Sequence, residues 1–226
     1  MLIPLYAHHS SLEWDKLLKH NLENCYIIIN PNDGPCVFSE KADWKSLVEK
    51  IIQKKGKIVV YIDSFRAVYK DKKWVLNPKS YLNLLEEHVK YEKIFGGKNI
   101  SGVFLDDYPA HGMMNDAPVK FARQVQKLLI LNPGTKVKEF NKIFAYPKNF
   151  DREKTVWLEH ETNKIPDVTL LNEPFIALEC STYPFEFYSL KINKFFYVHT
   201  QKDGANPYEK LSPHFIQMQM QRQRTE

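Results

Sequence analysis

Residues 102–112, GVFLDDYPAHG, form the segment of the chain whose residue types most directly suggest chemistry. An apolar run stops at two adjacent acids, Asp106 and Asp107, and Tyr108 follows them. Neighbouring carboxylates repel each other, so such a pair placed directly after a buried segment suggests a function beyond solubility. Because successive side chains of a strand point to opposite sides, these two acids cannot easily act as one catalytic couple. A facing partner must come from another strand.

Other apolar segments that are predicted as strands also finish in side chains that can hydrogen-bond or ionise. In a parallel α/β barrel the carboxyl ends of the strands converge on one face, where active sites lie. Any single one of these residues could be a turn cap or a satisfied core residue, but the repetition favours one shared site. The strand-end residues are Tyr6, His8, Asn30, Asn32, Asp63, Asp106, Asp107, Tyr108, Asn132, Glu179 and His199.

The residue types at these strand ends favour glycoside cleavage. They include carboxylates, asparagines, aromatic rings and histidines, with no serine or cysteine nucleophile beside a base. Paired carboxylates suit this reaction because one protonates the leaving oxygen while the other activates water or attacks the anomeric carbon. We predict Asp106, Asp107 and Glu179 as catalytic residues, with Glu179 as the facing partner. The remaining strand-end residues are predicted to bind the substrate.

A metal site is the alternative interpretation of some of the same residues. His8, His9, His111, Asp106 and Asp107 could together hold a hard or borderline cation. However, the histidines show neither HxH nor HExxH spacing, and no GxGxxG or GxxxxGK[ST] motif follows a strand. We therefore predict no metal and no cofactor.

The elements that must position these residues alternate between apolar strands and amphipathic helices. Ser10 and Glu13 predict a capping box for the first helix, and Asn77 with Pro78 is expected to open a later one. The stretch LLILNPG fits either the end of a helix or a fifth strand. Strands are predicted at 2–7, 25–29, 58–62, 102–105, 174–180 and 194–200.

Several segments have weaker patterns. A polar loop is expected after Asp63, and residues 136–168 have no clear period and are interpreted as an elaborated loop. Residues 183–194 are expected to form a short helix or turn, and residues 207–221 a closing helix. Continuously apolar strands separated by helices predict a parallel sheet covered by helices. We predict one domain over residues 1–226, a TIM-like (β/α) barrel with seven or eight strands and an inserted excursion near 136–170.

Composition narrows the class of protein. The 226 residues are 43% hydrophobic, which is enough for one full core, and the net charge of +5 comes from scattered lysines. A nucleic-acid binder would concentrate its basic residues on one element, so no nucleic-acid partner is expected. No apolar run approaches the roughly 20 residues needed to span a bilayer. Cys25, Cys36 and Cys180 show no CxxC spacing, so neither a disulfide framework nor a zinc site is predicted.

The first residues, MLIPLYAHHSSLEW, lack the basic and long apolar regions of a signal peptide. The chain as written is therefore expected to be cytoplasmic, or secreted if a leader has been trimmed from it. We expect a monomer with no membrane partner.

Five short motifs resemble the spherulin-4-like (spherulation-specific) family, and they occur in the family's order over roughly residues 2 to 200. They are IPLYAHHSSLEWDKL, IIINPNDGP, GVFLDDYP, LNPGT and IALECSTY. The resemblance implies a (β/α) barrel glycoside hydrolase, whose characterised relatives cleave exopolysaccharides rich in galactosamine and N-acetylgalactosamine. By position, Asp106 matches the family's aspartate, Asp107 its adjacent glutamate and Glu179 its later glutamate.

The resemblance predicts a glycoside hydrolase that acts on a carbohydrate polymer containing amino sugars. Asp107 departs from the pattern because it is one methylene shorter than the family's glutamate, which could withdraw a general acid from its substrate. The main alternative is therefore a carbohydrate-binding barrel that keeps the cleft but not the catalysis. A structural or stress-associated protein without a ligand would leave the polar strand ends unexplained.

Overall fold

A parallel β-sheet forms the centre of the protein. The computed structural model describes residues 1–70, 73–107, 116–132, 155–162, 176–180, 194–198, 207–212 and 215–216. The sheet has eight strands in the order β1-β2-β3-β6-β7-β8-β9-β10, and every pairing in it is parallel. The strands are β1 Leu2–Leu5, β2 Tyr26–Ile29, β3 Lys57–Asp63, β6 Ile100–Asp106, β7 Leu128–Leu131, β8 Thr155–Thr162, β9 Ile176–Cys180 and β10 Lys194–Val198.

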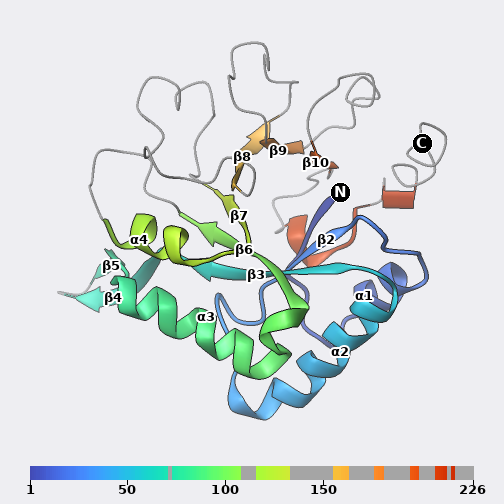
Figure 1. Ribbon diagram of the computed structural model, residues 1–226, viewed down its shortest axis with the longest axis horizontal. Helices are drawn as coiled ribbons and strands as arrows, with labels where there is room; N and C mark the ends of the chain where they lie inside the picture. The colour runs from blue at the N-terminus through green and yellow to red at the C-terminus, as the bar shows by residue number, and fades with distance from the viewer. Residues whose placement is uncertain are drawn as a thin grey trace.

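Helices cover the outer face of the part of this sheet that is formed by β1, β2, β3, β6 and β7 (Figure 1). They are α1 Leu12–Leu18, α2 Lys41–Gln53, α3 Tyr81–Phe95 and α4 Asp116–Gln124, with the 3-10 turns η1 Phe38–Glu40 and η2 Gly97–Asn99. In α2 the buried residues Trp44, Leu47, Val48 and Ile51 recur at helical spacing, as the sequence predicts. They join one apolar cluster with alternate residues of the strands. Among the described residues, no helix is long and apolar enough to cross a membrane.

The opposite face of the sheet carries a second, smaller apolar cluster. Because strand side chains alternate, the residues between those of the outer cluster point to this inner face. Its fully or nearly buried members are Leu2, Ile28, Val59, Tyr61, Phe104 and Ile130. Both faces of the sheet are thus apolar over β1, β2, β3, β6 and β7, which explains why these strands read as continuous apolar runs.

The connection between β3 and α3 differs from the prediction. The expected polar loop after Asp63 is wrong, because this segment forms an antiparallel hairpin of β4 Phe65–Lys70 and β5 Lys73–Pro78. The hairpin lies at the end of the molecule beyond α3 and α4 (Figure 1). Asn77 and Pro78 belong to β5 and do not open a helix. Ser80 caps α3 instead, and its hydroxyl accepts the Asn83 N–H.

The structure also corrects the sequence prediction at two other places and decides between two interpretations at a third. Ser11, rather than Ser10, caps α1, because its hydroxyl accepts the Glu13 N–H. The stretch LLIL is strand β7 and not a helix end. Residues 155–162 are strand β8 of the main sheet, so this part of the predicted excursion near 136–170 is wrong. The other residues of that range, 136–154 and 163–170, lie outside the described residues, as do 183–193.

The carboxyl-terminal segment returns to the beginning of the chain. Where a closing helix over 207–221 was predicted, Pro207–Glu209 forms the 3-10 turn η5, Phe215 and Ile216 are helical, and 213–214 and 217–221 lie outside the described residues. The Tyr6 N–H donates to the Tyr208 carbonyl at 2.7 Å. Phe215 is completely buried, and its ring lies 5.4 Å from that of His20. The described residues between 207 and 216 therefore pack against β1 and α1.

Candidate active site

Two carboxylates and an amide gather at the carboxyl ends of β3, β6 and β7. Asp63 and Asp106 are register partners at the ends of adjacent parallel strands, so their side chains leave the sheet on the same face. Asn132 follows β7, and its N–H donates to the Leu105 carbonyl at 3.0 Å, which continues the strand pairing by one residue. These three residues lie together at the carboxyl edge of the sheet, where the sequence predicts a site.

Asp106 is held by two donors. The Tyr61 hydroxyl donates to Oδ2 at 2.7 Å, and the Asn132 side-chain amide donates to Oδ1 at 2.5 Å. Tyr61 is buried, and burial, followed by the charge of Asp106, raises its pKa far above the ordinary value, so its hydroxyl remains a donor. With both oxygens occupied from neighbouring strands, the Asp106 carboxylate has a fixed orientation. A fixed carboxylate is suited to stabilise or attack an electron-poor carbon.

Asp63 has a different environment. Its Oδ1 accepts the Phe65 N–H at 2.7 Å. Burial raises the pKa of Asp63 to about 6, and the charges of Asp107 and Asp106 act in the same direction. The Phe65 N–H and the charge of Lys79 oppose the rise without cancelling it. Asp63 can therefore carry a proton at mildly acidic pH beside a fixed carboxylate, which is the property that a general acid requires.

Asp107 leaves the strand in another conformation. Its φ of 48° lies in the left-handed region, which non-glycine residues adopt uncommonly. The residue is exposed, whereas Asp106 is half-buried. The side chains of the two neighbouring acids therefore lie in different places, as the sequence predicts. The cause is the left-handed backbone at Asp107 as well as the alternation of side chains along a strand. The charge of Asp107 still acts on Asp63.

Aromatic and amide groups lie at the ends of β1 and β2. The Tyr6 ring is 5.6 Å from that of Tyr61 and 5.0 Å from that of Tyr208. Asn30 donates from Nδ2 to Asp33 Oδ1 at 3.2 Å, while its own Oδ1 is buried without a hydrogen-bond partner among the described residues. An unpaired buried acceptor is costly, so a donor on a bound molecule would be favourable there.

Some predicted site residues lie away from this group or outside the described residues. His8 faces Glu40, with 3.7 Å between His8 Nε2 and Glu40 Oε1, and Asn32 is exposed in the loop after β2. Glu179 lies on β9, where it pairs with Tyr197 of β10. Tyr108, His111 and His199 lie outside the described residues.

Tyr61 is the site residue that the sequence reasoning missed. The signal was present, because Tyr61 and Asp63 are two residues apart on one strand and therefore share a face. A tyrosine within an apolar run is more simply interpreted as core, and Tyr61 does belong to the inner cluster. Its hydroxyl, however, reaches Asp106, so the residue serves both the core and the site.

A separate cavity lies on the helical side of the molecule. It has a volume of about 650 Å³ and lies where the loop before η1 meets α2 and α3, with Cys36, Phe38, Lys45 and Ile94 in its lining. None of the predicted site residues lines it. The cavity is therefore not part of the strand-end group.

A solved structure with a similar fold supports this architecture. The structure of the glycoside hydrolase CpGH84B is similar, with a TM-score of 0.51 and 14% identity over 88% of this chain. The chain spans only 44% of that protein. Two structures of β-mannanase from Thermomonospora fusca, a mannohexaose and a mannotriose complex, have TM-scores of 0.48, at 10% and 11% identity. In both cases the aligned region covers 94% of this chain and 86% of the mannanase chain.

No curated protein matches the chain. A family model does match it, over residues 1–218, and that model describes spherulation-specific family 4. The match includes all five motifs noted in the sequence and all three strand ends that bring Asp63, Asp106 and Asn132 together. The α/β fold with a parallel sheet resembles that of a glycoside hydrolase, and the chain belongs to spherulation-specific family 4.

Proposed function

We propose that the protein is a glycoside hydrolase that cleaves a polysaccharide containing galactosamine and N-acetylgalactosamine. The observation that carries this proposal is the pair at the ends of β3 and β6. Asp106 is fixed by the Tyr61 hydroxyl and the Asn132 amide, while the adjacent Asp63 has a pKa raised to about 6. A carboxyl group that can hold a proton beside a second carboxyl group of fixed orientation is the arrangement that suits two-carboxylate glycoside cleavage.

The reaction assigns one role to a carboxylic acid and another to a carboxylate. The acid donates its proton to the glycosidic oxygen as the bond from the anomeric carbon to that oxygen breaks. The carboxylate either attacks the anomeric carbon or removes a proton from the attacking water. Asp106 is proposed for the carboxylate role. Asp63, Asp107 and Glu179 are the candidates for the proton donor.

Strand registers support a place for Glu179 opposite Asp106. Ile130 of β7 belongs to the inner cluster and pairs with Val156 of β8. Leu158, two residues later on β8, therefore lies on the same face, and it pairs with Ala177 of β9. Strand alternation then assigns position 179 to the same face of the sheet as Asp106. We further propose that the sheet closes into a barrel, which the proximity of β10 to β1 supports. Closure would bring β9 across the barrel mouth from β6.

The substrate class rests on the family resemblance, and the polar edge is compatible with it. Tyr6 offers an aromatic surface beside Tyr61, and sugar rings commonly stack on aromatic faces. The unpaired acceptor of Asn30 suits a sugar hydroxyl or an acetamido N–H. The proposed partner is therefore a carbohydrate polymer.

Release of reducing ends tests the proposal. The parent protein is expected to release them from a polymer containing galactosamine and N-acetylgalactosamine, but not from β-mannan. Asp106→Asn should lower this rate at least a hundredfold, because the amide keeps the shape and removes the charge. Asp43→Asn, at an exposed position on α2, is the matched control and should keep the parent rate. If Asp106→Asn turns over as fast as Asp43→Asn, the proposed site is wrong.

A carbohydrate-binding protein without catalysis is the second candidate. It is favoured by Asp107, which is exposed, has a left-handed backbone and is shorter than the glutamate expected from the family pattern. This candidate predicts saturable binding of the same polymer with no release of reducing ends. It also predicts that Asp107→Glu, which restores the longer side chain, gives the protein a measurable rate of release.

A further inference from the structure

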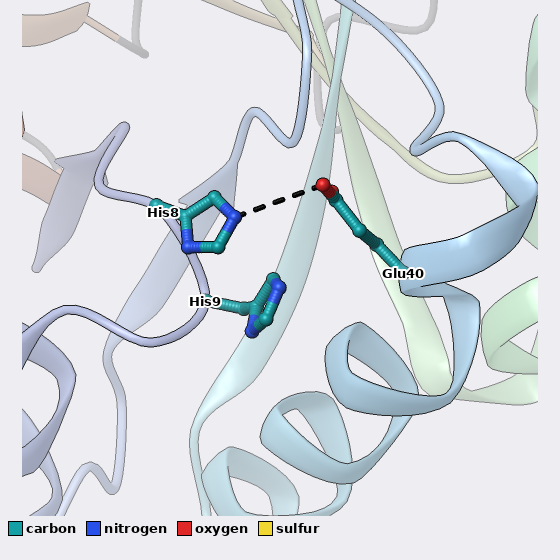
Figure 2. Close-up of side chains that lie close together, drawn as sticks. All are labelled: His8, His9 and Glu40. Carbon is teal, nitrogen blue, oxygen red and sulfur yellow. Dashed lines mark ion pairs between the residues drawn. The ribbon is translucent and has the colours of Figure 1, made fainter.

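The geometry points to a binding site for a divalent transition-metal ion, such as Zn²⁺, formed by His8, His9 and Glu40. Each residue offers one ligand atom, and these three atoms lie within 4.8 Å of one another. His8 and His9 come from the loop after β1, and Glu40 ends η1, directly before α2 (Figure 2). This group differs from the cation site that the sequence suggested, since it contains neither Asp106 nor Asp107.

The spacing suits a small metal ion. His8 Nε2 and Glu40 Oε1 are 3.7 Å apart, close to the roughly 3.4 Å that separates two ligands of a tetrahedral Zn²⁺ ion. The His8 and His9 rings lie side by side, with their centroids 4.0 Å apart, and Figure 2 shows both rings on the side of the loop that faces Glu40. Small rotations of the side chains would bring all three atoms to bonding distance.

Hydrogen bonds orient two of the three proposed ligands. His8 Nδ1 lies 2.8 Å from the Ser10 hydroxyl, and the Ser10 N–H donates to the same nitrogen at 3.4 Å. In the tautomer that binds a metal ion through Nε2, Nδ1 carries the proton and donates to the hydroxyl in place of the longer bond from the Ser10 N–H. Trp44 donates from its indole nitrogen to Glu40 Oε2 at 3.4 Å, which leaves Oε1 directed to His8.

The supporting residues themselves are buried and fixed. Trp44 is completely buried, and its ring also meets that of His9 at 5.7 Å. Trp14, nearly as buried, donates from its indole nitrogen to the carbonyls of Ala7 and His8 at 3.2 and 3.1 Å. The two tryptophans therefore hold the loop and the acid in place, while His8 remains open to solvent and to an entering ion.

Two imidazoles and one carboxylate are a ligand set for zinc and similar borderline ions. Three protein ligands leave one position of a tetrahedral ion for water. The site lies in the loops that follow β1 and β2, so a bound ion would join two loops at the carboxyl edge of the sheet. His8 is two residues from Tyr6, and the ion would thus stabilise the border of the proposed sugar site.

Titration with Co²⁺, a coloured substitute for Zn²⁺, tests the site directly. The full-length chain, freed of any histidine tag, is expected to bind one equivalent and to show the visible absorption of tetrahedral Co²⁺, which excess Zn²⁺ removes. Excess Zn²⁺ should also raise the melting temperature of the parent protein. His9→Ala and Glu40→Gln should each weaken binding at least about tenfold.

Two control variants locate the ion. His20→Gln removes a histidine that packs against Phe215 at another place, and Asp106→Asn changes the strand-end carboxylate; both should bind Co²⁺ like the parent. Loss of binding in Asp106→Asn with normal binding in His9→Ala would move the ion to the strand ends and overturn the proposal. Absence of saturable binding by the parent would overturn it too, leaving His8 and Glu40 as an ion pair.

Discussion

At the scale of single residues, Asp63 and Asp106 occupy paired positions yet have different surroundings. Asp106 is bonded through both oxygens to side chains of neighbouring strands, while Asp63 accepts one backbone N–H and has a pKa of about 6. Burial is the main cause of this raised pKa, so the proton on Asp63 is linked to folding.

Replacing Asp63 by asparagine tests this linkage. Between the ordinary aspartate pKa of 3.8 and the folded value of about 6, the folded protein holds a proton that the unfolded chain has released. The stability contribution of Asp63 therefore falls as pH rises through this window. After allowance for partial exposure, Asp63→Asn should be about 1 kcal/mol more stable than the parent at pH 7 and equal to it at pH 4. Urea denaturation at both pH values measures the difference; a difference independent of pH would contradict the raised pKa.

Tyr61 should contribute more to stability than a tyrosine that lacks its carboxylate partner. Tyr61→Phe removes a buried hydrogen bond to Asp106, and we expect a loss of about 1–2 kcal/mol in the free energy of unfolding. Tyr26→Phe is the control, because its half-buried hydroxyl lies 3.3 Å from Lys57 Nζ and should contribute less than about 0.5 kcal/mol. Equal losses in urea denaturation would show that the Tyr61 hydroxyl does not hold Asp106.

The sequence predicted part of the candidate site. Asp63, Asp106 and Asn132 were recognised because each ends an apolar strand, and parallel strands bring such ends together. The role of Tyr61 depends on a contact 45 residues away, which strand alternation suggests but does not prove. Nothing in the sequence indicated that Glu40 lies beside His8, because the two residues meet only through the packing of η1 against the loop after β1.

At the scale of elements, Gly102 fixes the distance between β6 and β7. A Cβ at this position would lie 2.8 Å from the Leu128 carbonyl oxygen, which belongs to the neighbouring strand and cannot rotate away. Gly102→Ala should therefore cost about 1–3 kcal/mol and disturb the contact between Asp106 and Asn132. At Gly97 the nearest atom is Glu92 Oε1, the end of a flexible side chain. Gly97→Ala should change stability by less than about 1 kcal/mol, and a similar loss in both variants would contradict the steric argument.

The strands were predicted better than the segments between them. A run such as Ile58–Ile62 is apolar at every position, which indicates a strand buried on both faces. The β4–β5 hairpin was missed because charged residues interrupt it and it pairs only with itself. Strand β8, TVWLEHET, mixes polar and apolar residues, so its place in the sheet follows from its neighbours rather than from its own pattern.

At the scale of the whole molecule, the carboxyl-terminal segment connects the end of the fold to its beginning. The Leu211 N–H donates to Glu13 Oε2 at 2.9 Å, and the Tyr6 N–H donates to Tyr208. Phe215 belongs to the same apolar cluster as Trp14 and Leu17 of α1. This segment is therefore part of the core and not an appendage.

Adjacent residues of this segment should respond very differently to truncation of their side chains. Phe215 is completely buried, and Phe215→Ala should lower the free energy of unfolding by about 3–5 kcal/mol through lost burial and a cavity. Ile216 is 51% exposed, and Ile216→Ala should change it by no more than about 0.5 kcal/mol. Thermal and urea denaturation of both variants measure the contrast. A small effect in both would mean that residues 207–216 do not belong to the core.

The return of this segment also affects how the protein is made. A ribosome synthesises α1 well before Leu211, the partner of Glu13, which follows 198 residues later, and before Phe215. Trp14 and Leu17 of α1, which share an apolar cluster with Phe215, are therefore incompletely covered when the helix first emerges. Such exposed surface on a nascent chain attracts chaperones and promotes aggregation. The contacts of α1 with this segment therefore form only after Leu211 and Phe215 have been synthesised.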